Sequence, residues 1–191
     1  MWQIHAAAAT ALRFDGNFHF MQNHFELFKL PVKYAIDRTV LDDAYREIQK
    51  IVHPDKFVNA SDTEKRVAMQ WAMHTNDAYQ ILRHPIKRAI YLCELHGFDA
   101  EMQSNVTMSS DFLLSQIEWR ETLENARTDK NVDKLEKLSI ELRTIQQKNM
   151  EQLHQMLQSQ HFGEAIQLVR KMVFIEKFND EINFAFDQID S

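Results

Sequence analysis

Residues 37–57 read DRTVLDDAYREIQKIVHPDKF, and this segment indicates which class of fold the chain adopts. Its apolar side chains recur every three or four residues, which places them on one face of a helix. Asp37 is a suitable N-cap for that helix. Pro54 ends it, because a proline disfavours the helical conformation of the residue before it. The segment therefore predicts an amphipathic helix that stops at the turn His53-Pro54-Asp55.

The segments on either side of this turn also read as helices. Ser61 and Glu64 form a capping box, which predicts the start of a helix whose apolar face runs to Leu82. Pro85 suits the first turn of the next helix, and Gly97 suits the position just after its end. Residues 22–30 predict one or two helical turns before Pro31. Further helices are predicted over 110–126, 132–157 and 162–189, with the spacing of an antiparallel bundle.

Composition supports an all-α fold. The 191 residues include only 3 Gly and 3 Pro, whereas a sheet protein of this size needs many tight turns built on those residues. The sequence has no Gly-rich phosphate loop. A single cysteine, Cys93, excludes an intrachain disulfide and a four-thiolate metal site within the chain. The nine histidines show no pair with metal-ligand spacing on one helix, so we expect no metal and no cofactor.

Charge divides the chain into two unequal parts. Residues 21–97 carry eleven basic and ten acidic side chains, whereas residues 98–191 carry ten basic and seventeen acidic ones. An acidic surface repels phosphate backbones, so the second part is not expected to bind nucleic acid. We predict four segments: an N-terminal extension outside the cores (1–20), a helical-hairpin domain (21–97), a linker (98–108) and a three-helix bundle (109–191).

The turn and its context resemble the J domain, the module that stimulates DnaK-type ATPase chaperones. The resemblance rests on His53-Pro54-Asp55-Lys56-Phe57, on the basic-tinged helix before it and on Asn76-Asp77-Ala78-Tyr79 after it. Residues 24–31 (HFELFKLP) and 82–99 are similar to the two ends of this domain in the HscB family of iron–sulfur assembly co-chaperones, and an acidic helical bundle follows. The resemblance covers roughly residues 21–191. It implies contact with the chaperone through His53, Pro54, Asp55, Arg46, Lys50 and Lys56.

A helical wheel of residues 110–126 identifies a second surface. With 100° per residue, one face holds the predicted core side chains Phe112, Gln116, Trp119, Leu123 and Ala126. The opposite face also holds three aliphatic residues, Leu113, Leu114 and Ile117, among glutamates. Such a patch either packs on another part of the chain or binds a partner with its apolar centre and acidic rim. The HscB resemblance implies that Leu113, Leu114, Ile117, Glu118, Glu121 and Phe174 bind the iron–sulfur scaffold protein.

We therefore predict a two-domain all-α co-chaperone: an N-terminal J domain, which is an antiparallel helical hairpin with a His-Pro-Asp loop, and a C-terminal three-helix bundle. The resemblance implies a DnaK-type partner of the HscA kind and a client of the IscU kind, with no membrane or nucleic-acid partner and no reaction catalysed by this chain. Two alternatives stay open. One is a J protein for another client, and the other is a helical enzyme that uses His53 and Asp55 as acid and base. The N-terminus is a poor secretory signal, and the sequence lacks the paired CxxC motifs of many eukaryotic members, so we expect a bacterial cytoplasmic protein.

Overall fold

The computed structural model describes residues 23–58, 60–99 and 108–189, and its ordered elements there are all helical. In chain order they are α2 (His24–Leu27), α3 (Arg38–Val52), the 3-10 helix η1 (Pro54–Phe57), α4 (Asp62–Arg83), α5 (Pro85–Leu95), α6 (Ser110–Thr128), α7 (Val132–Gln158) and α8 (Phe162–Ile189). The predicted all-α class is confirmed. The predictions for the 1–20 extension and for most of the 98–108 linker lie outside the described residues.

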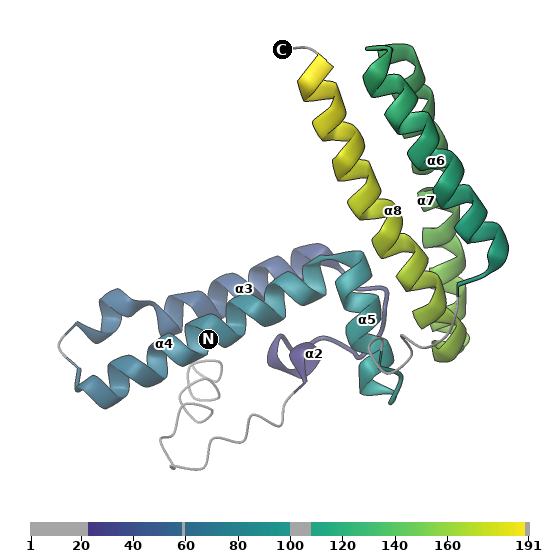
Figure 1. Cartoon of the computed structure of the whole chain (residues 1–191). Coiled ribbons are helices and arrows are strands. Elements are labelled where there is room, and N and C mark those ends of the chain that lie inside the picture. Colours follow the sequence, from purple (N-terminus) through teal and green to yellow (C-terminus); the bar gives the residue numbers. More distant parts are fainter. Residues whose placement is uncertain (1–22, 59, 100–107, 190–191) are drawn as a thin grey trace.

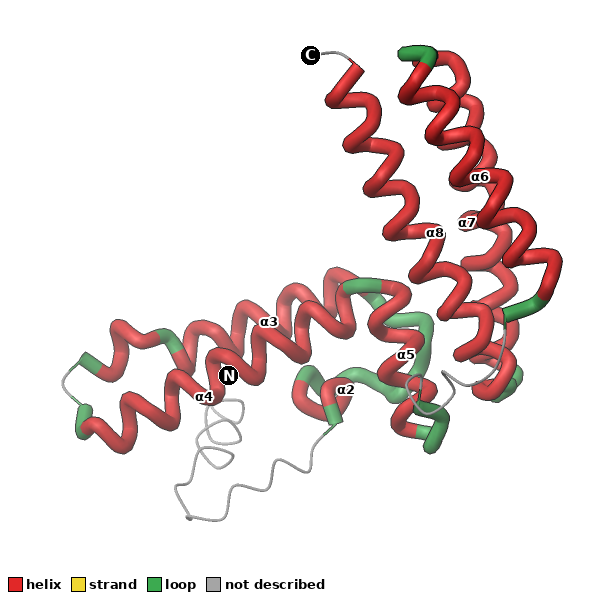
Figure 2. Tube along the Cα trace, viewed as in Figure 1, coloured by secondary structure: helices red, strands yellow, loops and turns green. Residues whose placement is uncertain are grey.

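The described helices form two arms that meet at an elbow (Figure 1). The antiparallel hairpin of α3 and α4 is one arm, with η1 at its outer end. Helices α6, α7 and α8 run side by side as the second arm, and α2 and α5 lie near the junction (Figure 2). The described part contains no helix that is both long and apolar enough to cross a bilayer.

Local capping explains why the helices begin where the sequence predicts. The Asp37 side chain accepts hydrogen bonds from the backbone amides of Thr39 (2.8 Å) and Val40 (3.4 Å) at the start of α3. Ser61 and Glu64 form both halves of the predicted capping box at the start of α4. A local difference is at residues 54–57, predicted as loop, which form the 3-10 helix η1. A proline at its first position has a backbone angle suited to that turn.

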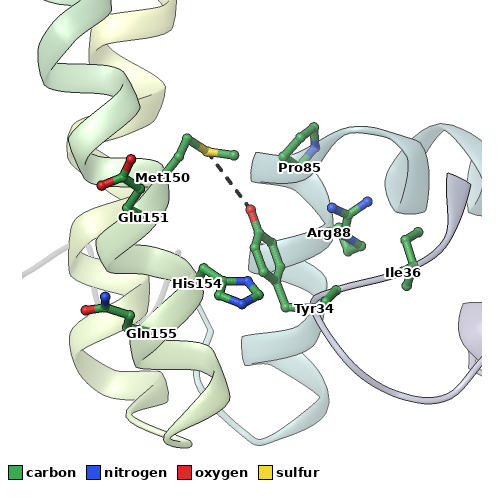
Figure 3. Close-up of a pocket in the computed structure, with 9 residues that line it drawn as sticks. Tyr34, Ile36, Pro85, Arg88, Met150, Glu151, His154 and Gln155 are labelled. Atoms are coloured by element: carbon green, nitrogen blue, oxygen red, sulfur yellow. Dashed lines mark hydrogen bonds between the residues drawn. The ribbon is translucent and has the colours of Figure 1, made fainter.

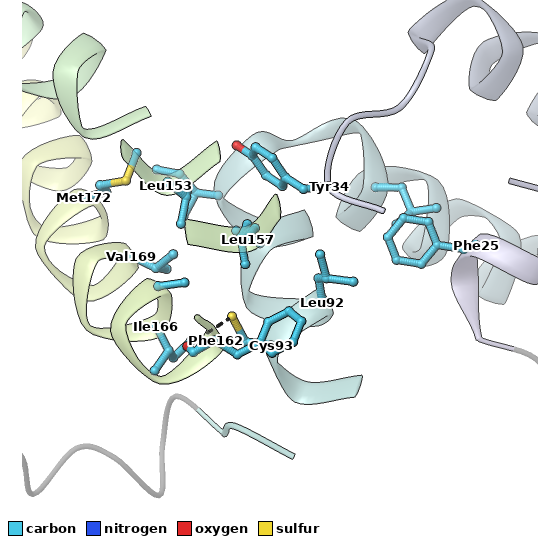
Figure 4. Close-up of a cluster of buried hydrophobic side chains, with 14 of the residues drawn as sticks. Phe25, Tyr34, Leu92, Cys93, Leu153, Leu157, Phe162, Ile166, Val169 and Met172 are labelled. Atoms are coloured by element: carbon cyan, nitrogen blue, oxygen red, sulfur yellow. Dashed lines mark hydrogen bonds between the residues drawn. The ribbon is translucent and has the colours of Figure 1, made fainter. Parts of the chain in front are cut away.

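One continuous hydrophobic core joins the two arms, and we call it the elbow core (Figure 4). It combines buried residues of α2, α4 and α5, such as Phe25, Leu82 and Leu92, with residues of α7 and α8, such as Leu157 and Phe162. His96 stacks on the Phe162 ring with a centroid distance of 3.9 Å. The helical hairpin and the three-helix bundle, which we predicted as separate domains on either side of residues 98–108, therefore share one hydrophobic core.

A second cluster, the distal core, holds the far half of the bundle together. Its α6 members are Trp119, Leu123 and Ala126, which are three of the side chains that the helical wheel assigned to the core face. They pack against buried residues of the other two helices, namely Leu135, Leu138, Leu142, Ile175, Phe178, Ile182 and Ala185. Trp119 Nε1 also donates a hydrogen bond to Glu141 Oε1 at 2.9 Å, so the indole N–H is satisfied.

Candidate functional site

The His53-Pro54-Asp55 turn lies at the outer end of the α3–α4 hairpin, away from the elbow (Figure 1). It is the connection between the last turn of α3 and the 3-10 helix η1. The His53 and Asp55 side chains are 54% and 88% exposed. An exposed imidazole and carboxylate held on a short, proline-fixed turn form a surface that another protein can contact.

The His53 side chain caps η1. Its Nδ1 accepts a hydrogen bond from the Asp55 amide at 3.3 Å, and the Asp55 Oδ2 atom lies 3.6 Å from the same nitrogen. A nitrogen that accepts this bond carries no proton, so the neutral ring carries its proton on Nε2. The capped ring therefore offers its Nε2–H donor to a partner.

Two cations on α3, Arg46 and Lys50, are paired with acids of the same helix. Arg46 contacts Asp43 at 2.9 Å, and Lys50 contacts Glu47 at 2.7 Å, each pair one turn apart and more than 60% exposed. Exposed pairs of this kind contribute little to stability and exchange readily. Lys56 on η1 is exposed, and the described residues include no ion pair to it. The predicted chaperone-binding side chains of Arg46, Lys50, His53, Asp55 and Lys56 are thus all exposed, and their role in chaperone binding stays a prediction.

The aliphatic patch on α6, defined as Leu113, Leu114 and Ile117, faces away from both cores. These side chains are 42%, 59% and 54% exposed. Glu118 and Glu121 beside them are also exposed. The wheel left open whether the patch packs on another part of this chain. Exposure of all three side chains excludes full burial by the described residues and leaves them available to a partner.

Phe174, which was predicted to belong to this surface, is more covered than the three aliphatic residues. It is half-buried on α8, where its ring packs edge-on against Phe112 and parallel to Phe178. The Arg120 guanidinium lies 5.8 Å from the Phe174 ring centre. The wheel of α8 alone could not detect this cover, because Phe112 and Arg120 belong to another helix. Phe174 therefore contacts α6 at Phe112, on the wheel face that holds the core side chains.

The structure also has an open groove of about 540 Å³ at the elbow (Figure 3). Its walls are the 34–36 segment, α5 and α7, with Tyr34, Arg88, Met150 and His154 among the lining residues. Arg88 lies over the Tyr34 ring at 5.0 Å and donates to the Leu82 carbonyl at 2.6 Å. The groove does not contain the His53 and Asp55 pair that an enzyme mechanism would use. The described residues include no group of three potential metal ligands close enough to hold an ion.

Comparisons of the sequence and of the structure with known proteins all match members of one family. A family model described as the HSCB C-terminal oligomerisation domain matches residues 108–183. The co-chaperone protein HscB homolog of Paraburkholderia xenovorans is 44% identical over 169 residues, which is 88% of this chain and 97% of the relative. The structure of chaperone HscB from Vibrio cholerae has a TM-score of 0.77 at 34% identity and covers 88% of this chain and 99% of that one. Human co-chaperone protein HscB has a TM-score of 0.80 at 25% identity over 85% and 81% of the two chains.

These similarities extend over both arms and not only over the hairpin. The matched relatives are named co-chaperones, and they align over almost their full length. The arrangement of a hairpin ending in His53-Pro54-Asp55 and a three-helix bundle is the one that the resemblance implied. The chain therefore belongs to the HscB family of co-chaperones.

Proposed function

We propose that this chain stimulates the ATPase of a DnaK-type, HscA-like chaperone and delivers an IscU-like iron–sulfur scaffold protein to it. The observation that carries the proposal is the placement of two exposed surfaces on separate arms joined by one core. The turn at His53–Asp55 ends one arm. The aliphatic patch lies on the other.

In this proposal the hairpin arm binds the chaperone. The Nε2–H of His53, the carboxylate of Asp55 and the cations on α3 and η1 provide polar contacts for a chaperone surface with complementary charge. The i, i+3 ion pairs of Arg46 and Lys50 are exposed, so these cations can exchange their acidic partners for those of the chaperone at small cost.

The bundle arm binds the scaffold protein. The aliphatic patch supplies an apolar centre, and Glu118 and Glu121 supply part of a charged rim, which is the usual anatomy of a protein interface. Burying one such aliphatic side chain contributes roughly 1.5–3 kcal/mol. The matching surface on the scaffold is expected to be apolar in its centre and basic at its edge.

ATP hydrolysis itself occurs on the chaperone. This chain contributes by binding chaperone and client at the same time, which favours the chaperone conformation that hydrolyses ATP and holds the client. The chemical steps therefore need no nucleophile, metal or cofactor on this chain. We place the process in the bacterial cytoplasm.

The test is the ATPase rate of an HscA-like chaperone measured with this chain, with an IscU-like scaffold, and with both together. We expect stimulation by the chain alone and a larger, more than additive stimulation by both. Stimulation by the chain with no effect of the scaffold would identify a J protein for another client. No stimulation under any condition would contradict the proposal.

A further inference from the structure

A polar contact joins α3 and α4 about one turn of α4 beyond the hydrogen bond that the Tyr79 hydroxyl donates to Asp42 Oδ1 (2.9 Å). Asn76 Oδ1 on α4 accepts two hydrogen bonds from α3, one from the Tyr45 hydroxyl and one from Gln49 Nε2, each 2.7 Å long. Both lengths are within the normal range for strong protein hydrogen bonds. We call this three-residue contact the hairpin latch.

The geometry of the latch resists movement of α3 along its own axis. Tyr45 and Gln49 are one turn apart, which separates them by about 6 Å along the helix. Both donors reach the same oxygen, so the Tyr45 hydroxyl and the Gln49 amide meet at a single point on α4. A shift of α3 along its axis displaces both donors from this one oxygen, so the shared acceptor couples the position of α3 to that of α4.

The latch lies between the elbow core and Val52, which is buried at the end of α3 with an exposed fraction of 3%. Helix α3 fully buries only Leu41 and Val52. Some side chains of α3 belong to the elbow core or pack against it. Among the described residues, they all lie between Leu41 and Ile48 in the sequence. The last turn of α3, which leads to His53, therefore extends beyond that core. The polar contact at Gln49 and the buried Val52 side chain together hold this turn in position.

The side chains that face a chaperone are the direct neighbours of the latch. Arg46 follows Tyr45 and Lys50 follows Gln49, so each cation is rotated by about 100° from a latch donor. If the latch fixes the rotation of α3 about its own axis, it also fixes the directions in which Arg46 and Lys50 extend from the helix. The turn at His53 begins three residues after Lys50 and moves with the same helical end.

We propose that Asn76 is a positioning residue for chaperone binding: it holds α3 in the register and rotation that present the cationic face and the His53–Asp55 turn together. This inference rests on the proposed chaperone-stimulating function. In the proposed arrangement Asn76 does not contact the chaperone. It acts only through its hydrogen bonds with Tyr45 and Gln49.

The central experiment compares Asn76→Leu, which has a similar size but no acceptor, with Asn76→Asp, which keeps acceptor oxygens for both donors. The matched control is Gln80→Leu, the same kind of change one turn further along α4 at an exposed side chain with no hydrogen bond recorded among the described residues. The concentration of chain that gives half-maximal stimulation of an HscA-like ATPase is measured for each, together with the maximal stimulated rate.

We expect Asn76→Leu to raise the half-maximal concentration by up to about tenfold, which corresponds to about 1.4 kcal/mol. The maximal rate should stay unchanged, because the contacting residues are all present. Asn76→Asp and Gln80→Leu should match the unmodified chain, and scaffold binding should be the same for all four proteins. Half-maximal stimulation by Asn76→Leu at the unmodified concentration would overturn the inference.

A second measurement separates this inference from the proposed function. Hydrogen exchange of the backbone amides at 49–52 should be faster in Asn76→Leu than in the unmodified chain or in Gln80→Leu, whether or not any chaperone responds. Equal exchange in all three would also overturn the inference. If Asn76→Leu does not fold, the double variant Tyr45→Phe with Gln49→Leu removes the donors instead. The inference then requires the same rise in half-maximal concentration, and an unchanged value would overturn it.

Discussion

At the scale of single residues, His53 is expected to be essential for chaperone stimulation and dispensable for the fold. Its ring is 54% exposed and makes one capping bond within its own turn. Substitution of an exposed residue usually changes stability by no more than about 0.5 kcal/mol. We predict that His53→Gln abolishes ATPase stimulation, while its thermal unfolding and its affinity for the scaffold stay unchanged. Normal stimulation by this variant would contradict the assignment of the turn.

Cys93 provides a prediction about chemical reactivity. The side chain is fully buried, and its thiol donates to the Phe162 carbonyl at 3.7 Å. Burial, with a smaller contribution from Glu94, raises the pKa of the Cys93 thiol to about 12. Because the thiolate is the reactive form, the folded chain should not react with iodoacetamide at pH 8. The same chain in urea should be labelled completely. Rapid labelling of the folded chain, followed by mass spectrometry, would show that the elbow core opens.

At the scale of helices, the patch on α6 can be separated from the core face of the same helix. Leu113, Leu114 and Ile117 are exposed, so their joint replacement by alanine opens no cavity in the described structure. We predict that this triple variant binds the scaffold at least tenfold more weakly, because central interface residues often contribute about 2 kcal/mol or more each. Calorimetric titration with the scaffold measures the affinity. Stimulation of the chaperone without scaffold should be unaffected.

Trp119→Ala is the control for this experiment. The Trp119 side chain is buried in the distal core and donates to Glu141. Removing a buried tryptophan costs about 3–5 kcal/mol, so this variant should unfold at a clearly lower temperature. A triple variant that unfolds like Trp119→Ala would show that the patch is part of the core. A stable triple variant that still binds tightly would place the client elsewhere.

The C-terminal end of α6 gives a prediction about the free energy of unfolding. Helix α6 ends in a Schellman motif, in which the amide of Asn131 donates to the Ala126 carbonyl at 2.8 Å. This motif requires a left-handed residue, and Lys130 occupies that position with a φ of 49°. An L residue there carries a steric cost that glycine does not have. We therefore predict that Lys130→Gly stabilises the protein by about 0.5–1 kcal/mol, as measured by urea unfolding. Lys134→Gly, within α7, should destabilise it by a similar amount.

At the scale of the whole molecule, the shared elbow core predicts that the J domain depends on the bundle. Leu153, Leu157, Phe162, Ile166, Val169 and Met172 belong to this core and come from α7 and α8. Each large apolar side chain contributes roughly 1.5–3 kcal/mol when buried, and a whole domain is stable by only about 5–15 kcal/mol. We predict that a chain of residues 21–97 alone unfolds at a much lower temperature than the full chain, or without a cooperative transition.

The full chain should instead show a single unfolding transition in circular dichroism. Leu157→Ala is a point variant that tests the same coupling without truncation, because Leu157 lies in the elbow core but belongs to the bundle. It should lower the unfolding temperature of the α3–α4 hairpin and of the bundle together. Independent melting of the two arms, or an isolated 21–97 chain as stable as the full one, would show that the elbow core is not shared in solution.

Most helix boundaries were predictable because their causes are local. A 3.6-residue apolar period, an Asp37 or Ser61 cap and a proline after α3 act within a few residues of the boundary that they set. The wheel placed Leu113, Leu114 and Ile117 opposite the core face but left open whether another part of the chain covers them, and the tertiary structure shows that they are exposed. The 3-10 turn at Pro54 was missed because a loop and one short turn share the same residue types.

The helical class, the order and most ends of the helices and the position of the His53-Pro54-Asp55 turn were thus predictable from the residues alone, whereas the exposure of the aliphatic patch was one of two open alternatives. Only the tertiary structure decided how the arms join, how Phe174 is covered by Phe112 and Arg120, and which acceptor Tyr45 and Gln49 share. The physical reason is the range of the interactions. Periodicity and capping depend on neighbours within one or two helical turns. Core packing and the latch join residues that are tens of positions apart in the sequence. The sequence of one helix does not indicate which residue of another helix it will contact.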